Sequence, residues 1–374
     1  MKSQTKNASK RNGTISLVKF LAAILVMIYH GGRILIGKNH NFSSQTGYVL
    51  VDLFFIISGY YFYKSILKIK DKDVDIYKEN ILATVKRLKS FLPYTITIGI
   101  ATIILKYMNN LLLRREAMMS IFNIFLFDMS GLSGYTINGP TWYLSAMLII
   151  FFVEFPIIYI NKKNYSKYIA PIITIFGLGY IYKSFGSLNI FLTGWNGFFY
   201  NGLIRALVDI NLGIIIYEIS ESLRQKINEF GKTKKIILEL IHISLYLFIG
   251  YFVLFYKDEG EIDYFAYVVI VVALLISFSE TILSNLFDKK IVNYLERISL
   301  PIFINQFFFL DLLNIINESE AYSFSLMLLI YSVATIMFSI IEYHIINFIQ
   351  LLLKKNKLCF GEKYEKKKIK YWIT

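Results

Sequence analysis

The chain has 374 residues, of which 56% are hydrophobic and 17% aromatic, and its formal net charge is +14. A soluble protein of this length could not bury so much apolar surface, so the composition excludes a soluble globular protein. One cysteine excludes a disulfide framework and a cysteine-based metal site, and the sequence has no HExxH, P-loop, nucleotide-binding GxGxxG or GxSxG motif. We therefore predict no metal site.

Runs of about twenty apolar residues indicate an all-α, polytopic membrane bundle of about ten transmembrane helices. A shorter apolar piece at 117–129 is either an interfacial or re-entrant helix or an eleventh span. The first run is too long for a cleavable signal peptide, so we expect it to stay in the membrane. We predict spans at 15–36, 46–67, 90–109, 139–160, 166–184, 197–218, 236–256, 262–285, 298–316 and 322–353.

The positive charges follow this alternation of spans. With the N-terminus inside, 31 of the 40 Lys and Arg residues fall in inner segments and seven in outer loops. The positive-inside rule then explains the net charge without nucleic acid and places both termini in the cytoplasm. We expect basic tails at 1–14 and 354–374 around one membrane domain at 15–353. Abundant Ile, Lys and Asn are typical of an AT-rich bacterial genome, which favours a multi-pass protein of the bacterial plasma membrane.

The first predicted span carries a cation, Lys19, near its start and an imidazole, His30, near its end. Eleven residues make about three helical turns, so the two side chains share one face, roughly 16 Å apart. Ionisable groups in a membrane helix usually face the protein interior and indicate function. His30 could therefore accept a proton from a substrate hydroxyl, and the alternative is that it has a purely structural role.

Thr14 or Ser16 is the predicted N-terminal cap of this first helix.

Asp52 lies about two turns into the second predicted span, among Val, Leu and Phe. A buried carboxylate needs a partner. We predict that this partner is His30, whose ring Asp52 would orient as in catalytic triads. The alternatives are an interfacial aspartate and a structural salt bridge. Further along, Ser58 and Gly59 are small residues at which two helices can approach closely.

A basic segment, KRLKSFLPY, precedes the third predicted span. Its cations Arg87 and Lys89 lie at the predicted cytoplasmic mouth, and Pro93 begins the span. Clusters of Lys and Arg bind phosphate groups well, which favours a phosphate-binding rim. The alternative is an ordinary positive-inside flank.

The segment NGPTWYLS begins the fourth predicted span, and its Gly-Pro pair breaks the chain just before it. Its aromatic residues, Trp142 and Tyr143, either belong to the belt at the membrane interface or stack on a sugar ring or an acyl chain.

Four polar residues lie in later apolar spans. Arg205 must be paired or face water, which favours a functional role. Asn305, Gln306 and Asp311 lie in an aromatic helix and need hydrogen-bond partners.

Taken in order, these elements resemble the family-3 membrane acyltransferases, which O-acylate extracytoplasmic glycans. That family opens with an arginine, ten residues and a histidine, and continues with a GVDLFFVLSGF-like run and a basic RxxRIxPxY-like segment. A PLWFLS-like element, an arginine before an apolar stretch ending in LG, and an ISYxIYLxH-like helix follow. The resemblance runs from about residue 13 to about residue 350. The matching positions are Lys19 and His30, Leu50–Tyr60, Arg87 with Pro93 and Tyr94, Pro140–Ser145, Arg205 with Leu212 and Gly213, and Ile298–Gln306.

The resemblance implies an O-acyltransferase, most simply an O-acetyltransferase of polysaccharide modification. Its donor substrate would be cytoplasmic acyl-coenzyme A, commonly acetyl-coenzyme A, with no permanently bound cofactor. Its acceptor would be a hydroxyl of an extracytoplasmic or lipid-linked glycan. His30 would be the catalytic base, oriented by Asp52, and the donor phosphates would bind Lys19, Arg87 and Lys89. The substrate-binding residues would be Arg33, Trp142, Tyr143, Arg205, Asn305 and Gln306.

The chain differs from the family pattern at several positions. Lys19 and Ser90 stand where the family has arginines, Ala146 stands near a common acidic position, and Gln306 replaces a frequent histidine. Two alternatives to an enzyme stay open: an exporter or non-catalytic binding protein, and a structural partner in polysaccharide assembly. The sequence is compatible with a homo-oligomer and does not name the acceptor glycan.

Overall fold

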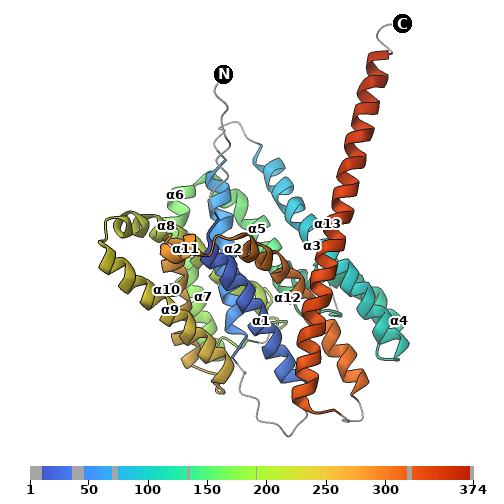
Figure 1. The fold of residues 1–374 in the computed structure, drawn as a ribbon, viewed down its shortest axis with the longest axis horizontal. Coiled ribbons are helices and arrows are strands. Elements are labelled where there is room, and N and C mark those ends of the chain that lie inside the picture. Colours follow the sequence, from blue (N-terminus) through green and yellow to red (C-terminus); the bar gives the residue numbers. More distant parts are fainter. Residues whose placement is uncertain are drawn as a thin grey trace.

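The computed structural model describes residues 11–35, 46–69, 75–132, 135–190, 192–317 and 322–370, with side chains up to residue 353. These parts of the chain form helices and contain no strand (Figure 1). The predicted all-α class is therefore confirmed.

Each of the ten predicted spans corresponds to a long helix. These helices are α1 (Gly13–Leu35), α2 (Val49–Leu67), α3 (Ile76–Met108), α5 (Thr141–Ile160), α7 (Ala170–Phe185), α8 (Asn201–Asn228), α9 (Lys232–Phe255), α10 (Ile262–Phe278), α12 (Lys290–Ile316) and α13 (Phe324–Lys370). The shorter elements are α4 (Arg114–Ile124), η1 (Asp128–Ser130), α6 (Lys162–Asn164), η2 (Tyr165–Ile169) and α11 (Ile282–Leu286).

Eight helices of the described chain are long and apolar enough to cross a membrane, where α6, η2 and α7 together form one continuous helix, Lys162–Phe185. The two other predicted spans are α8 and α10, and each departs from an ordinary span for its own reason. α10 has only 17 residues. α8 carries Arg205, Asp209 and Glu218 among its apolar residues, so its interior is unusually polar for a membrane helix.

Two helix boundaries differ from the prediction. α3 begins at Ile76 rather than at residue 90, because the Asp75 side chain caps it by accepting a hydrogen bond of 3.1 Å from the Lys78 amide. The basic segment is therefore helical. α1 is capped by the Asn12 side chain, which accepts from the Ile15 amide, and not by Thr14 or Ser16.

The apolar piece at 117–129 is not an eleventh span. It forms α4, which has 11 residues, followed by the short helix η1. Eleven residues rise about 16 Å, roughly half of the hydrocarbon core of a bilayer.

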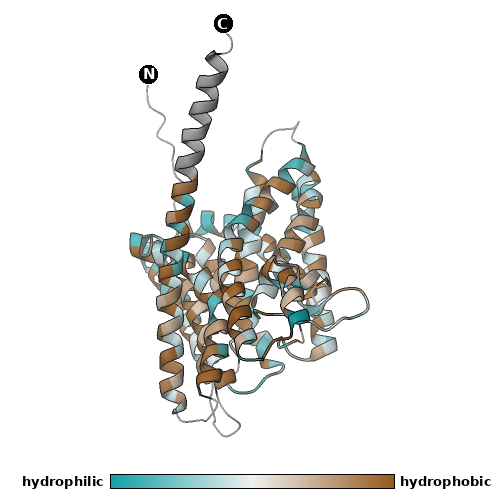
Figure 2. Cartoon of the chain, turned by 90° about the vertical axis from the view of Figure 1, so that its right-hand side faces the viewer, coloured by the Kyte–Doolittle hydropathy of each residue, from teal (hydrophilic) through white to brown (hydrophobic). Residues whose placement is uncertain are grey.

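The ends of the described chain lie on one side of the bundle. In Figure 1, α1 runs downward from its start and α13 runs upward to its end, as an even number of spans requires. Hydrophobic residues predominate along the helices, and many hydrophilic residues gather toward this same side (Figure 2).

Two glycines allow α2 and α8 to pack backbone against backbone. A Cβ atom on Gly59 would lie 2.1 Å from the Ile210 carbonyl oxygen, and one on Gly213 would lie 2.2 Å from the Ile56 carbonyl oxygen. Any larger residue would force the helices apart, so Gly59 is a point of close helix approach, as predicted.

Candidate functional site

α1 and α12 run side by side in the same direction. Lys19 Nζ lies 2.8 Å from Glu296 Oε1, and the ring of His30 lies 4.9 Å from the ring of Phe307. Eleven residues separate the two members on each helix. Lys19 and His30 therefore share one face of α1, and α12 covers this face.

The His30 ring is packed between aromatic side chains. Its centroid lies 4.8 Å from that of Tyr29 and 4.9 Å from that of Phe307. Its nitrogens form no hydrogen bond or ion pair with a residue that the structure describes. One turn further, Arg33 donates a hydrogen bond of 2.7 Å to the Tyr29 hydroxyl and lies 3.8 Å from Glu259. The imidazole is thus positioned by packing on aromatic rings.

The predicted pairing of Asp52 with His30 is wrong. Both carboxylate oxygens of Asp52 accept hydrogen bonds from Arg205, at 2.5 Å from Nε and 2.9 Å from Nη2. Arg205 also donates to the Tyr48 carbonyl oxygen at 2.8 Å. Both side chains are fully buried at the contact of α2 with α8. Arg205 therefore forms a buried ion pair with Asp52, and its predicted contact with substrate stays a prediction.

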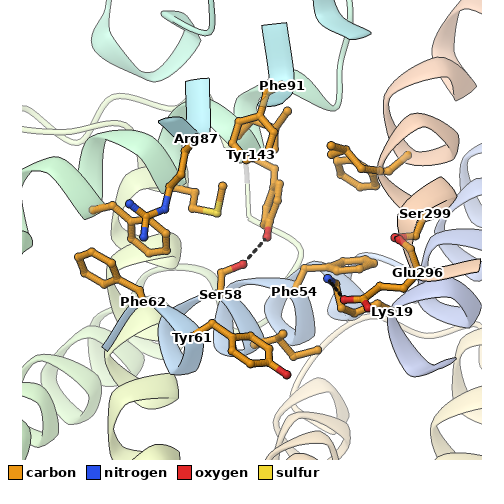
Figure 3. A pocket seen from close by; sticks show the side chains of 16 residues that line it. Lys19, Phe54, Ser58, Tyr61, Phe62, Arg87, Phe91, Tyr143, Glu296 and Ser299 are labelled. Atoms are coloured by element: carbon orange, nitrogen blue, oxygen red, sulfur yellow. Dashed lines mark hydrogen bonds and ion pairs between the residues drawn. The ribbon is translucent and has the colours of Figure 1, made fainter. Parts of the chain in front are cut away.

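An aromatic cavity of about 320 Å³ lies between α1, α2, α3, α5 and α12. Figure 3 shows Arg87 and Phe62 at one end and Lys19 with Glu296 at the other. Its lining residues are Lys19, Phe54, Ile57, Ser58, Tyr61, Phe62, Arg87, Phe91, Tyr143, Leu144, Met147, Phe151, Glu296, Ser299, Leu300 and Phe303.

Three polar groups stand out in the aromatic cavity. Arg87 lies over the rings of Phe62 and Phe151, at 5.3 and 4.7 Å from their centroids. The hydroxyl groups of Ser58 and Tyr143 are 3.1 Å apart, so one donates to the other (Figure 3). The cavity thus offers an apolar channel with a guanidinium and two hydroxyls, which suits a thin chain with amide groups.

A second, basic cavity of about 550 Å³ adjoins the first and shares Lys19, Tyr61, Glu296 and Leu300 with it. Six basic side chains line it, against two acidic ones. They come from the start of α1, the end of α2, the end of α8 and the start of α12, all on the predicted cytoplasmic side. The charged residues are Arg11, Lys19, Lys64, Lys68, Arg224 and Arg297, with Glu280 and Glu296.

The aromatic cavity ends one helical turn short of His30. Phe303 lines the cavity, and Phe307, four residues later on α12, contacts the His30 ring. One turn of helix corresponds to about 6 Å. The two cavities and His30 therefore follow one line along α12, from the predicted inner side outward.

The NGPTWYLS segment packs against α12 beside the aromatic cavity and His30. Asn138 Nδ2 donates to the Ile304 carbonyl oxygen at 3.0 Å, and a Cβ atom on Gly139 would lie 2.8 Å from the Phe307 ring. The following Tyr143 lines the aromatic cavity, whereas Trp142 packs on Phe55 and is not among the lining residues. The glycine is needed for close approach to the aromatic ring that touches His30.

The polar residues of α12 have protein partners. Asn305 Nδ2 donates to Glu342 at 2.7 Å and to Ser339 at 3.1 Å on α13. Gln306 donates to the Phe303 carbonyl oxygen at 2.8 Å, and Asp311 pairs with Lys106 at 2.8 Å. The amide N–H groups thus find partners within the protein, whereas Asn305 Oδ1 and Gln306 Oε1 have none among the described residues, and neither side chain lines the two cavities.

Only some of the residues that line the two cavities are predictable from the sequence. Of the three predicted phosphate-binding cations, Lys19 lines both cavities, Arg87 lines the aromatic one, and Lys89 is exposed outside both. The missed residues are Glu296 and the other five cations of the basic cavity. These cations were visible as positively charged flanks of spans, but only the packing of the helices brings them together.

Comparison with known families identifies the chain. A family model described as an acyltransferase domain, that of acyltransferase family 3, matches residues 12–344. Searches of curated proteins and of solved structures gave no match. The match includes α1 with Lys19 and His30, the residues that line the two cavities apart from Arg11, and the first part of α13. The chain therefore belongs to the family-3 acyltransferases and is a polytopic membrane acyltransferase.

Proposed function

We propose that the protein transfers an acyl group, in the simplest case acetyl, from cytoplasmic acyl-coenzyme A to a hydroxyl of an extracytoplasmic or lipid-linked glycan. The observation that carries this proposal is the junction of a basic cavity with an aromatic one along α1 and α12. Coenzyme A has the same two parts, since its phosphates are strongly anionic and its pantetheine arm is long and thin.

The donor fits the two cavities in one orientation. Its phosphates and nucleoside occupy the basic cavity, among Arg11, Lys64 and the other cations. Its pantetheine arm passes into the aromatic cavity, where Ser58 and Tyr143 meet its amide groups. The thioester then lies at the Phe303 end of this cavity, one turn from His30.

His30 acts as general base in the transfer. A ring nitrogen takes the proton of the acceptor hydroxyl while the oxygen attacks the thioester carbonyl carbon. The carbon–sulfur bond breaks as the tetrahedral intermediate collapses, and the leaving thiolate takes the proton back from the imidazolium. The products are an O-acyl ester and free coenzyme A, and the imidazole returns to its neutral form.

Release of free thiol by purified protein tests the proposal. Acetyl-coenzyme A labelled in the acetyl group is mixed with a glycan extract, and both thiol and labelled glycan are measured. We expect thiol release that depends on the extract and matches the label transferred. Transport of a glycan into vesicles with no thiol release would contradict the proposal and favour an exporter. Mass spectrometry of glycans from cells with and without the gene then identifies the acceptor.

A further inference from the structure

The Lys19–Glu296 ion pair lies where the two cavities meet. Both residues line both cavities, together with Tyr61 and Leu300. Glu296 is anchored on its other side, because Ser16 donates a hydrogen bond of 2.7 Å to its second carboxylate oxygen. In Figure 3 the pair projects into the end of the aromatic cavity opposite Arg87. A ligand that extends from one cavity into the other must pass this pair.

This pair differs in burial from the other charged pair of the site. The side chains of Lys19 and Glu296 are 28% and 22% exposed, whereas those of Arg205 and Asp52 are 4% and 1% exposed. Partly exposed, single-contact ion pairs are weak and open readily, but a buried bidentate pair does not. The Lys19–Glu296 pair is therefore suited to opening during a binding cycle.

The other charged side chains of the basic cavity indicate what kind of ligand would open the Lys19–Glu296 pair. Within the described residues, Lys19 and Arg224 are the cations of the basic cavity that have a carboxylate partner, and Arg224 pairs with Glu221 and Glu280. The remaining cations of the basic cavity have no carboxylate partner among the described residues, so their charge is available to attract an anion into the cavity. Once there, a phosphate group competes with Glu296 for the Lys19 ammonium group.

We propose that Lys19 and Glu296 form a latch that the donor's phosphate groups open, and that Glu296 thereby excludes acyl thioesters without phosphate. With the cavities empty, the ion pair closes the junction. Phosphate bound in the basic cavity takes Lys19 from Glu296, and the carboxylate stays with Ser16. The pantetheine arm then enters. This inference rests on the proposed function, because it presupposes a donor with phosphates and a thioester arm.

The test compares two donors in the Glu296→Gln variant. Acetyl-coenzyme A carries phosphates, whereas the acetyl thioester of N-acetylcysteamine has the thioester end without them. We expect the ratio of kcat/KM for the phosphate-free thioester to kcat/KM for acetyl-coenzyme A to rise about tenfold in Glu296→Gln, which corresponds to a preference shift of about 1.4 kcal/mol. The amide keeps the shape of the side chain, so folding should be preserved.

Asp311→Asn is the matched control. Asp311 lies on the same helix and forms a similarly half-buried pair with Lys106, and it lies outside both cavities. This variant should keep the donor preference of the wild type. An unchanged preference in folded Glu296→Gln would overturn the latch while leaving the acyltransferase intact. Absence of thiol release by wild-type protein from acetyl-coenzyme A would instead overturn the proposed function, and the latch with it.

Discussion

Arg205 binds both carboxylate oxygens of Asp52 where α2 and α8 pack against each other. This relationship joins two motifs, the VDLFF run of α2 and the arginine of α8, into one structural unit. The same helix α2 carries Ser58 and Phe54 into the aromatic cavity.

Asp52→Asn should therefore destabilise the protein before it affects chemistry. Removing one member of a buried ion pair leaves the other charge unpaired, which typically costs about 3–5 kcal/mol. We expect a marked fall in the thermal unfolding midpoint in detergent. The double variant Asp52→Asn/Arg205→Gln should recover part of the loss. Unchanged stability together with a shifted pH profile of activity would restore the rejected link between Asp52 and His30.

His30→Ala should abolish most of the transfer activity without unfolding the protein. A general base contributes about 10²–10⁴-fold to rate, so we expect kcat to fall at least 100-fold in the thiol-release assay. His344→Ala is the control, because this histidine on α13 contacts Tyr294 and lies outside both cavities. If His30→Ala kept turnover within about threefold of wild type, the assignment of the base would be wrong.

Arg87→Ala and Lys89→Ala should separate two neighbouring cations. The guanidinium of Arg87 lies over two rings of the aromatic cavity, whereas Lys89 is exposed. We expect the KM for acetyl-coenzyme A to rise about tenfold in Arg87→Ala, the equivalent of about 1.4 kcal/mol, and less than twofold in Lys89→Ala. Equal effects would mean that the whole basic segment acts as a rim, as the sequence suggested.

Gly213→Ala should disrupt the contact between α2 and α8. The added Cβ would lie 2.2 Å from the Ile56 carbonyl oxygen and 2.7 Å from the Tyr60 amide nitrogen, and neither backbone atom can move independently. We expect a loss of about 1–3 kcal/mol or more of stability, seen as a lower unfolding midpoint. Gly250→Ala, where a Cβ would meet nothing within 4 Å, should leave the midpoint unchanged. Similar midpoints for the two variants would show that the helices can separate without cost.

The sequence predicted the helices well because their signals are local. A run of apolar residues is detectable without knowing its neighbours, and all ten predicted spans correspond to helices. The prediction that Gly59 permits close approach of two helices is also confirmed, since a glycine inside an apolar helix leaves room for the backbone of a neighbouring helix. Cytoplasmic termini, the acyl-coenzyme A donor and the glycan acceptor stay predictions.

The pairing of charged groups was not predictable in the same way. The sequence predicts His30 as the partner of Asp52, yet the partner is Arg205, 153 residues away, and Lys19 pairs with Glu296 across 277 residues. Each of these side chains needed a partner, and the sequence indicated that need. Which partner it received depends on the order of the helices and on the rotation of each about its own axis.

The amino-acid sequence alone thus determined the class of the protein, its spans and the identity of the polar groups that membrane burial makes costly. The tertiary structure alone decided that six cations from four helix ends line one cavity, and that an ion pair stands where this cavity meets an aromatic one. The physical reason is that hydrophobic burial acts on each segment separately, whereas a binding site requires side chains from several helices at defined distances.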